Sequence, residues 1–198
     1  AEKETKLWYN DIINTAYHEM QAKGYHYWWS VKANEISSFN EKLLPLPDKQ
    51  KANFIVTAVS KIHAYHKGRK GYSSEDKGYK ISNIESTFIQ HLLKSKLVLD
   101  DEDIITIVEA FLAHSFQDYN THILYWPVNM LVNQVEKQVK ERGLSEALST
   151  TLQRLHTRVS EQAHRHQEKE QSKILVKIEA MLFSNNPENT GVKPIFFT

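Results

Sequence analysis

The ten histidines of the chain are the residues best suited to metal or acid–base chemistry. His63 and His66 lie three positions apart, so one face of a helix could present both of them to a metal ion. Glu161 and His164 have the spacing found in carboxylate-bridged di-iron bundles. That site needs a second pair of the same kind, and no other acid stands three residues before a histidine. Neither pair therefore completes a metal site.

Other catalytic patterns are incomplete or absent from the sequence. His18 and Glu19 begin like the helix motif of zinc proteases, but Ala22 stands where the second histidine is needed. The chain has no cysteine, and it has no nucleophile elbow or glycine-rich phosphate loop. We expect no catalytic residue, no bound metal and no cofactor. An enzyme whose site combines histidines and acids from several helices is the weaker alternative.

The stretch 67–80 is strongly basic and is the most loop-like part of the chain. It holds three glycines and five basic residues, with Tyr72 and Tyr79 between them. Basic side chains contact phosphates and tyrosines stack on bases. The candidate nucleic-acid contacts are Lys67, Arg69, Lys70, Tyr72 and Lys77. Glu75 and Asp76 interrupt the basic run, so the alternative is a mobile, solvated surface loop over residues 67–80.

Aromatic residues gather in two places and are candidates for a partner-binding surface. Such clusters contribute much of the binding energy at protein interfaces. The candidates are Trp28 and Trp29 in the first cluster, and Tyr119, Tyr125 and Trp126 in the second. The alternative is that these rings fill the core, because each ring buries a large apolar area.

The composition is that of an ordinary globular domain of 198 residues, with 40% apolar and 25% charged residues. A net charge of +1 gives no overall attraction to nucleic acid or to acidic membranes. No apolar run approaches the ~18–20 residues that span a bilayer. We expect a cytoplasmic protein with one domain over residues 1–198 and a linker-like tail over 184–198. The ending on Phe196, Phe197 and Thr198 favours a fragment of a longer chain.

Apolar residues at helical spacing predict an all-α fold. The expected helices cover residues 4–22, 34–44, 49–66, 82–96, 101–116, 127–142, 145–159 and 168–183. Three residues are expected to cap helices: Asp48, Asp100 and Ser145. Ser82 and Glu85 have the spacing of a capping box. Pro127 suits the first position of its helix, where a missing N–H costs nothing.

The helices are expected to form antiparallel pairs: 34–44 with 49–66, 82–96 with 101–116, and 127–142 with 145–159, with 168–183 left unpaired. The last two full pairs align at a shift of 44 residues. The shift places Ile104, Val108 and Phe111 on Leu148, Leu152 and Leu155, and Ile84 and Phe88 on Val128 and Val132. Repeats of about 40–47 residues built from paired helices are typical of HEAT and armadillo proteins. We predict a short array of that kind. The alternative is an irregular helical bundle, because amphipathic helix pairs align easily.

Residues 81–183 resemble the helical region of large bacterial proteins that carry a DUF4132-type domain of unknown function. The likeness lies in Tyr125-Trp126-Pro127, in the helix end Glu136-Lys137-Gln138-Val139-Lys140, and in Gly143-Leu144-Ser145. It implies a bacterial origin and a regulatory or scaffolding segment within a longer chain. It brings no catalytic residues.

The predicted function is a helical interaction or scaffolding module whose partner is another protein or another domain of the parent chain. The alternative is a nucleic-acid-associated helical domain that uses the loop 67–80.

Overall fold

The computed structural model describes residues 2–69, 71, 73, 75–113, 122–161 and 168–184, except for the side chains of residues 2–6, 29 and 122–126. Within these ranges the chain is helical and has no strand, which confirms the all-α prediction. The α-helices are α1 (Glu2–Ala22), α2 (Asp48–His66), α3 (Lys77–Lys94), α4 (Asp101–Leu112), α5 (His122–Arg142), α6 (Glu146–Glu161) and α7 (Glu168–Ser184). Two 3₁₀ segments, η1 (Trp28–Ser30) and η2 (Ala33–Glu35), and a short π-helix, η3 (Phe39–Leu43), connect α1 to α2.

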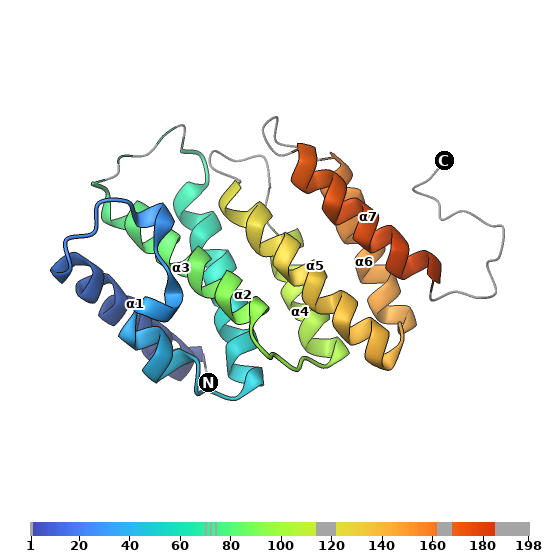
Figure 1. Cartoon of the computed structure of the whole chain (residues 1–198), viewed down its shortest axis with the longest axis horizontal. Helices are drawn as coiled ribbons and strands as arrows, with labels where there is room; N and C mark the ends of the chain where they lie inside the picture. Colours follow the sequence, from blue (N-terminus) through green and yellow to red (C-terminus); the bar gives the residue numbers. More distant parts are fainter. Residues whose placement is uncertain are drawn as a thin grey trace.

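The helices form a two-layer stack that runs from α1 at the left of Figure 1 to α7 at the right. One layer contains α1, α3, α5 and α7, and the other contains α2, α4 and α6. Each helix packs against the next member of its own layer, while α3 on α2 and α7 on α6 join the two layers. The helices do pack in pairs, which confirms that part of the prediction, but the pairs that join the layers are α2–α3 and α6–α7. The predicted pairing of 82–96 with 101–116 and of 127–142 with 145–159 was wrong, and the last helix, expected to be unpaired, packs on α6.

The core fills the space between the layers. All ten residues that the 44-residue shift aligns are at most 1% exposed. The helices that the shift relates, α3 with α5 and α4 with α6, are neighbours within a layer. The 3.6-residue spacing of apolar side chains therefore located the buried face of each of these helices correctly.

An aromatic cluster fills the end of the core beneath α1. The ring of Tyr9 on α1 lies 4.8 Å from that of Phe54 on α2, and Phe54 lies 6.2 Å from Phe88 on α3. Phe39 of η3 lies 5.1 Å from Phe88. These rings pack together where α1, α2, α3 and η3 meet. A polar group buried among them has little access to water.

The predicted start of α3 was wrong. The helix begins at Lys77, and the Asp76 carboxylate caps it by accepting from the Gly78 N–H at 2.9 Å. Ser82 lies inside the helix, where its hydroxyl donates to the Tyr79 carbonyl at 3.0 Å, so it forms no capping box with Glu85. Residues 77–80 therefore belong to a helix and not to the basic loop. The earlier start follows from Tyr79, which is buried and anchors the first turn.

Other boundaries also differ from the prediction. Asp100 and Ser145 cap their helices as expected, accepting from the N–H groups of Asp103 and Leu148 at 2.7 and 3.2 Å. Asp48 is instead the first residue of α2, after Pro47. Pro127 lies inside α5, which begins at His122, so one backbone hydrogen bond is missing from its N-terminal part. Residues 34–44, expected as one helix, are divided between the 3₁₀ segment η2 and a short helical segment that contains the π-helix η3.

The link between α3 and α4 is an extended segment held by three polar contacts. Leu97 and Leu99 are buried, while Val98 is 68% exposed. The Val98 N–H donates to the Asp48 carboxylate at 3.0 Å. The Leu97 carbonyl accepts from the side-chain amides of Gln134 and Gln138 on α5. The segment thus ties α2 to α5 across the stack.

None of the described helices is both long and apolar enough to cross a membrane.

Candidate functional site

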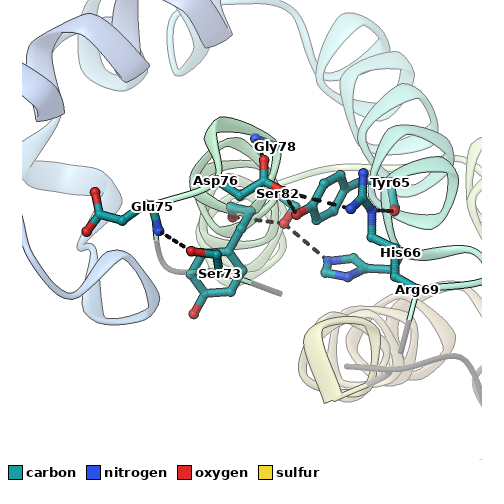
Figure 2. A network of polar contacts seen from close by, with 9 residues as sticks. Tyr65, His66, Arg69, Ser73, Glu75, Asp76, Gly78 and Ser82 are labelled. Atoms are coloured by element: carbon teal, nitrogen blue, oxygen red, sulfur yellow. Dashed lines mark hydrogen bonds and ion pairs between the residues drawn. The ribbon is translucent and has the colours of Figure 1, made fainter. Parts of the chain in front are cut away.

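The junction of α2 and α3 is where the sequence placed the basic loop, and Figure 2 shows its polar contacts. The Tyr65 hydroxyl donates to Asp76 at 2.7 Å. Arg69 Nε donates to the Tyr65 carbonyl at 2.7 Å, and its guanidinium lies 4.2 Å from the centre of the Tyr65 ring. Arg69 is also 3.8 Å from Asp76. The charge of Arg69 is therefore largely balanced within the chain.

The ionisation of Tyr65 and Asp76 reflects this contact. Burial, together with the hydrogen bond to Asp76, raises the pKa of Tyr65 to about 12. The same hydrogen bond, helped by the Gly78 N–H, lowers the pKa of Asp76 below its usual value. Asp76 is thus a carboxylate at neutral pH, and it serves as helix cap, tyrosine acceptor and ion-pair partner at once.

The lysines at the start of α3 also lie over aromatic rings of the chain. Lys77 Nζ is 5.0 Å from the centre of the Tyr17 ring, and Lys80 Nζ is 5.3 Å from that of Trp28. Lys80 is buried and also donates to Gln21 at 3.4 Å. Lys67 is exposed, while Lys70 and Tyr72 lie outside the described residues. Because Arg69, Lys77 and Lys80 have aromatic or acidic neighbours, the stretch offers less free positive charge than its sequence suggests.

A histidine and a serine meet beneath this junction, but not as a base and its nucleophile. His66 Nε2 is 3.2 Å from the Ser82 hydroxyl, and both residues are buried (Figure 2). The single hydroxyl proton of Ser82 is donated to the Tyr79 carbonyl. The Tyr79 carbonyl thus competes with His66 for that proton, and burial keeps both side chains away from any substrate. The pair is structural.

A second serine–histidine pair is extended by an acid on α7. His156 Nε2 lies 2.8 Å from the Glu179 carboxylate, and the Ser160 hydroxyl lies 3.5 Å from His156 Nδ1. The order of groups resembles a hydrolase triad. Ser160 is, however, in the last turn of α6, where carbonyls and not N–H groups point along the helix axis, and the carbonyls of Val159 and Ser160 accept from the Gln171 side chain. A negative end of a helix dipole opposes an oxyanion, so this contact ties α6 to α7.

Metal ligation finds no support in the described residues. They contain no group of three histidine, aspartate or glutamate side chains arranged to hold an ion. His63 and His66 are on α2, but no third ligand among these residues joins them. His164 lies outside the described residues, so the Glu161–His164 spacing has no geometry to assess.

A deeply buried polar contact joins α1 to α3. The Tyr9 hydroxyl donates to the Glu85 carboxyl across 76 positions of sequence, and Glu85 is only 2% exposed. Burial raises the pKa of Glu85 to about 8. Burial and the neighbouring Glu85 carboxyl raise the pKa of Tyr9 well above its usual value. One signal for this contact was in the sequence, because Glu85 interrupts the apolar stripe that contains Ile84 and Phe88.

The predicted aromatic surface is only partly described. Trp28 is 1% exposed and stacks on Tyr17 at 5.8 Å, so it belongs to the core, which was the alternative. Tyr119 and the side chains of Trp29, Tyr125 and Trp126 lie outside the described residues. Among the described residues, α7 carries two exposed large apolar side chains, Val176 at 61% and Phe183 at 51%.

No protein-family model matches this chain, and neither does any curated protein or solved structure. The likeness to DUF4132-type proteins therefore stays a prediction.

Proposed function

We propose that this chain is a helical scaffold that binds another protein or another domain of its parent chain, with no catalytic site of its own. The supporting observation is the alternation of helices between two layers, in which each helix packs mainly on its neighbours. We interpret the stack as a short HEAT- or armadillo-like array. Such arrays are built in this way, and they present extended surfaces to partners. Bacterial origin and cytoplasmic location remain sequence-based parts of the proposal.

The polar clusters favour this function over catalysis. Each cluster that could do chemistry has a structural explanation within the described residues: Asp76 caps α3, His66 contacts Ser82 in the interior, and Glu179 contacts His156. A general base or nucleophile needs access to substrate and a vacant proton position. Neither His66 nor Glu85 is accessible, because both are buried.

The outer face of α7 is the surface we assign to the partner. Val176 and Phe183 are exposed there, and Ala180 lies between them on the same face. Exposed apolar groups that cluster on one helix mark interaction sites more often than single ones do. α7 also ends its layer, so its outer face has no described neighbour.

The proposal is tested by in-cell crosslinking of the parent protein with mass spectrometry. The double variant Val176→Glu/Phe183→Glu should lose crosslinks from α7 to its partner. The matched control is Val98→Glu, which changes an equally exposed valine on the α3–α4 link and should keep them. A parent protein whose α7 forms no crosslink to another protein or domain would contradict the proposal.

The alternative function, nucleic-acid association through residues 67–80, is tested by a salt titration. Binding of a fluorescent single-stranded oligonucleotide should weaken steeply with salt if phosphates are contacted. The double variant Lys67→Ala/Lys77→Ala would then reduce the salt dependence, while Lys137→Ala on α5 would not. We expect no binding of this kind, because the neighbouring cations already lie on Tyr65 and Trp28.

A further inference from the structure

The Tyr9–Glu85 contact lies in an apolar setting at the end of the stack. Glu85 is one helical turn before Phe88, and the Tyr9 ring lies against Phe54. The hydroxyl of Tyr9 is the hydrogen-bond partner of the carboxyl, and Ile84 and Ile89 beside Glu85 are fully buried. A carboxylate at this position loses its hydration, and the single hydrogen bond from Tyr9 compensates only part of that loss. Burial therefore favours the protonated form.

Among the residues that the structure describes, no cation lies within contact distance of Glu85 to compensate a charge on its carboxyl. From α1 the facing titratable group is Tyr9, and from α2 it is Lys61, which is exposed and acts through space without an ion pair. Glu35 of η2 pairs with the Tyr25 hydroxyl, and Lys80 of α3 turns to Trp28 and Gln21. From residue 127 to the end of α5, where side chains are described, no buried residue is charged. An ionised Glu85 would keep one hydrogen bond and no counter-ion.

We propose that the Tyr9–Glu85 contact is a protonation-controlled latch, which holds α1 on α3 while the carboxyl is protonated and releases α1 when it ionises. A released α1 would let water reach Glu85, whose pKa would return towards its ordinary value of about 4.3. The docked state thus binds the proton more tightly than the released state. Docking is strongest at low pH, and its equilibrium constant falls by up to about tenfold per pH unit until the pH passes the docked pKa.

The position of α1 makes the release local. α1 ends its layer and packs mainly on α3 and η3, whereas α3 also packs on α2 and α5. Loss of α1 leaves the contacts among α2 to α7 in place. It uncovers the apolar face of α3 together with Ile12, Ile13, Ala16 and Met20 of α1. The latch therefore couples proton concentration to exposure of a helix-binding surface, at the end opposite to α7.

Hydrogen exchange of the full chain, followed by mass spectrometry between pH 6 and 9 and corrected for intrinsic rates, tests the latch. Peptides from α1 should open about tenfold more per pH unit up to pH 8 and then level off, while peptides from α6 should not change. In Glu85→Gln the opening of α1 should not depend on pH. The matched control Glu179→Gln, which alters the carboxyl at the other end, should leave the response of α1 intact.

Three outcomes would overturn the latch: protection of α1 that does not change with pH, equal opening of α1 and α6, or an unchanged response in Glu85→Gln. If Glu85→Gln fails to fold, a carbon-13 titration of the wild-type Glu85 carboxyl replaces it. Its midpoint must coincide with the opening of α1. A midpoint near the ordinary glutamate value would reject the proposal.

Discussion

At the N-terminal end of the stack, α1 is joined to α3 by a phenol–carboxyl contact deep in the aromatic cluster. At the other end, α7 is joined to α6 by His156 and Glu179, and the Glu179 side chain is 23% exposed. Lys177 of α7 also donates to Asn129 and Asn133 of α5 at 3.3 and 2.5 Å. A glutamate carboxyl thus holds each end of the stack, but Glu179 is partly exposed to water and Glu85 is buried. From this difference we expect the protonation state of Glu85 to control the contact at α1, and the His156 partner to hold the contact at α7.

The largest expected effect comes from breaking the element that joins both ends. Val132 on α5 is fully buried, so Val132→Asp would place an unpaired charge between helices. We expect a loss of about 4 kcal/mol or more in the free energy of unfolding. Urea denaturation followed by circular dichroism, with hydrogen exchange of α1 and α7, should show that both ends melt together. Wild-type stability would mean that the buried face of α5 is assigned wrongly.

A pH series separates the two ends. Because the pKa of Glu85 is raised to about 8 in the fold, its stabilisation is complete below the unfolded pKa and is lost as the pH rises towards 8. The free energy of unfolding should fall by at most about 1.4 kcal/mol per pH unit in that window. Glu85→Gln should flatten the curve, and Glu179→Gln should not. A difference between wild type and Glu85→Gln that is constant from pH 5 to pH 9 would contradict the comparison.

Removing the phenol tests the buried end alone. Tyr9→Phe keeps the ring against Phe54 but leaves the buried Glu85 carboxyl without its partner. We expect a cost of about 1–3 kcal/mol at pH 6, measured by urea denaturation. Tyr25→Phe is the matched control, because the Tyr25 hydroxyl also donates to a glutamate, Glu35, but at an exposed site. An equal loss of stability in both variants would show that the burial of Glu85 does not determine the strength of the contact.

The smallest effect is expected at the α7 end. Glu179→Gln keeps the shape of the side chain and a hydrogen-bond acceptor for His156, at a site that water reaches. We expect a loss below about 1 kcal/mol in a thermal melt at pH 7, as for other partly exposed pairs. A loss as large as that of Tyr9→Phe would show that the two ends depend on their carboxyls equally.

The fold was largely predictable because its information is local. Apolar stripes such as Ile104, Val108 and Phe111 located the core face, and the side chains of Asp100 and Ser145 marked helix starts. The start of α3 was missed because glycines and charges around Asp76 resemble a loop, while the anchor that makes it helical is the burial of Tyr79. Burial of that kind depends on the neighbouring helices and not on local spacing.

The contacts of the candidate site were much less predictable. Tyr9 meets Glu85 across 76 positions, and His156 meets Glu179 across 23, so no motif spacing contains either pair. Trp28 could be placed in the core or on the surface by its type alone, and only packing against Tyr17 decides it. The sequence identified basic residues such as Arg69 as candidate phosphate contacts, but it did not reveal the aromatic and acidic side chains that lie against them.

The α3–α4 link has a consequence for aggregation. An extended, partly apolar segment with unpaired backbone groups is a template on which a strand of another molecule can grow. Here the Val98 N–H is bonded to Asp48, and the Leu97 carbonyl is saturated by Gln134 and Gln138. The N–H of the exposed Val98 and the carbonyl before it are therefore already occupied, so Asp48 and the two glutamines of α5 remove two of the backbone groups that an incoming strand would use.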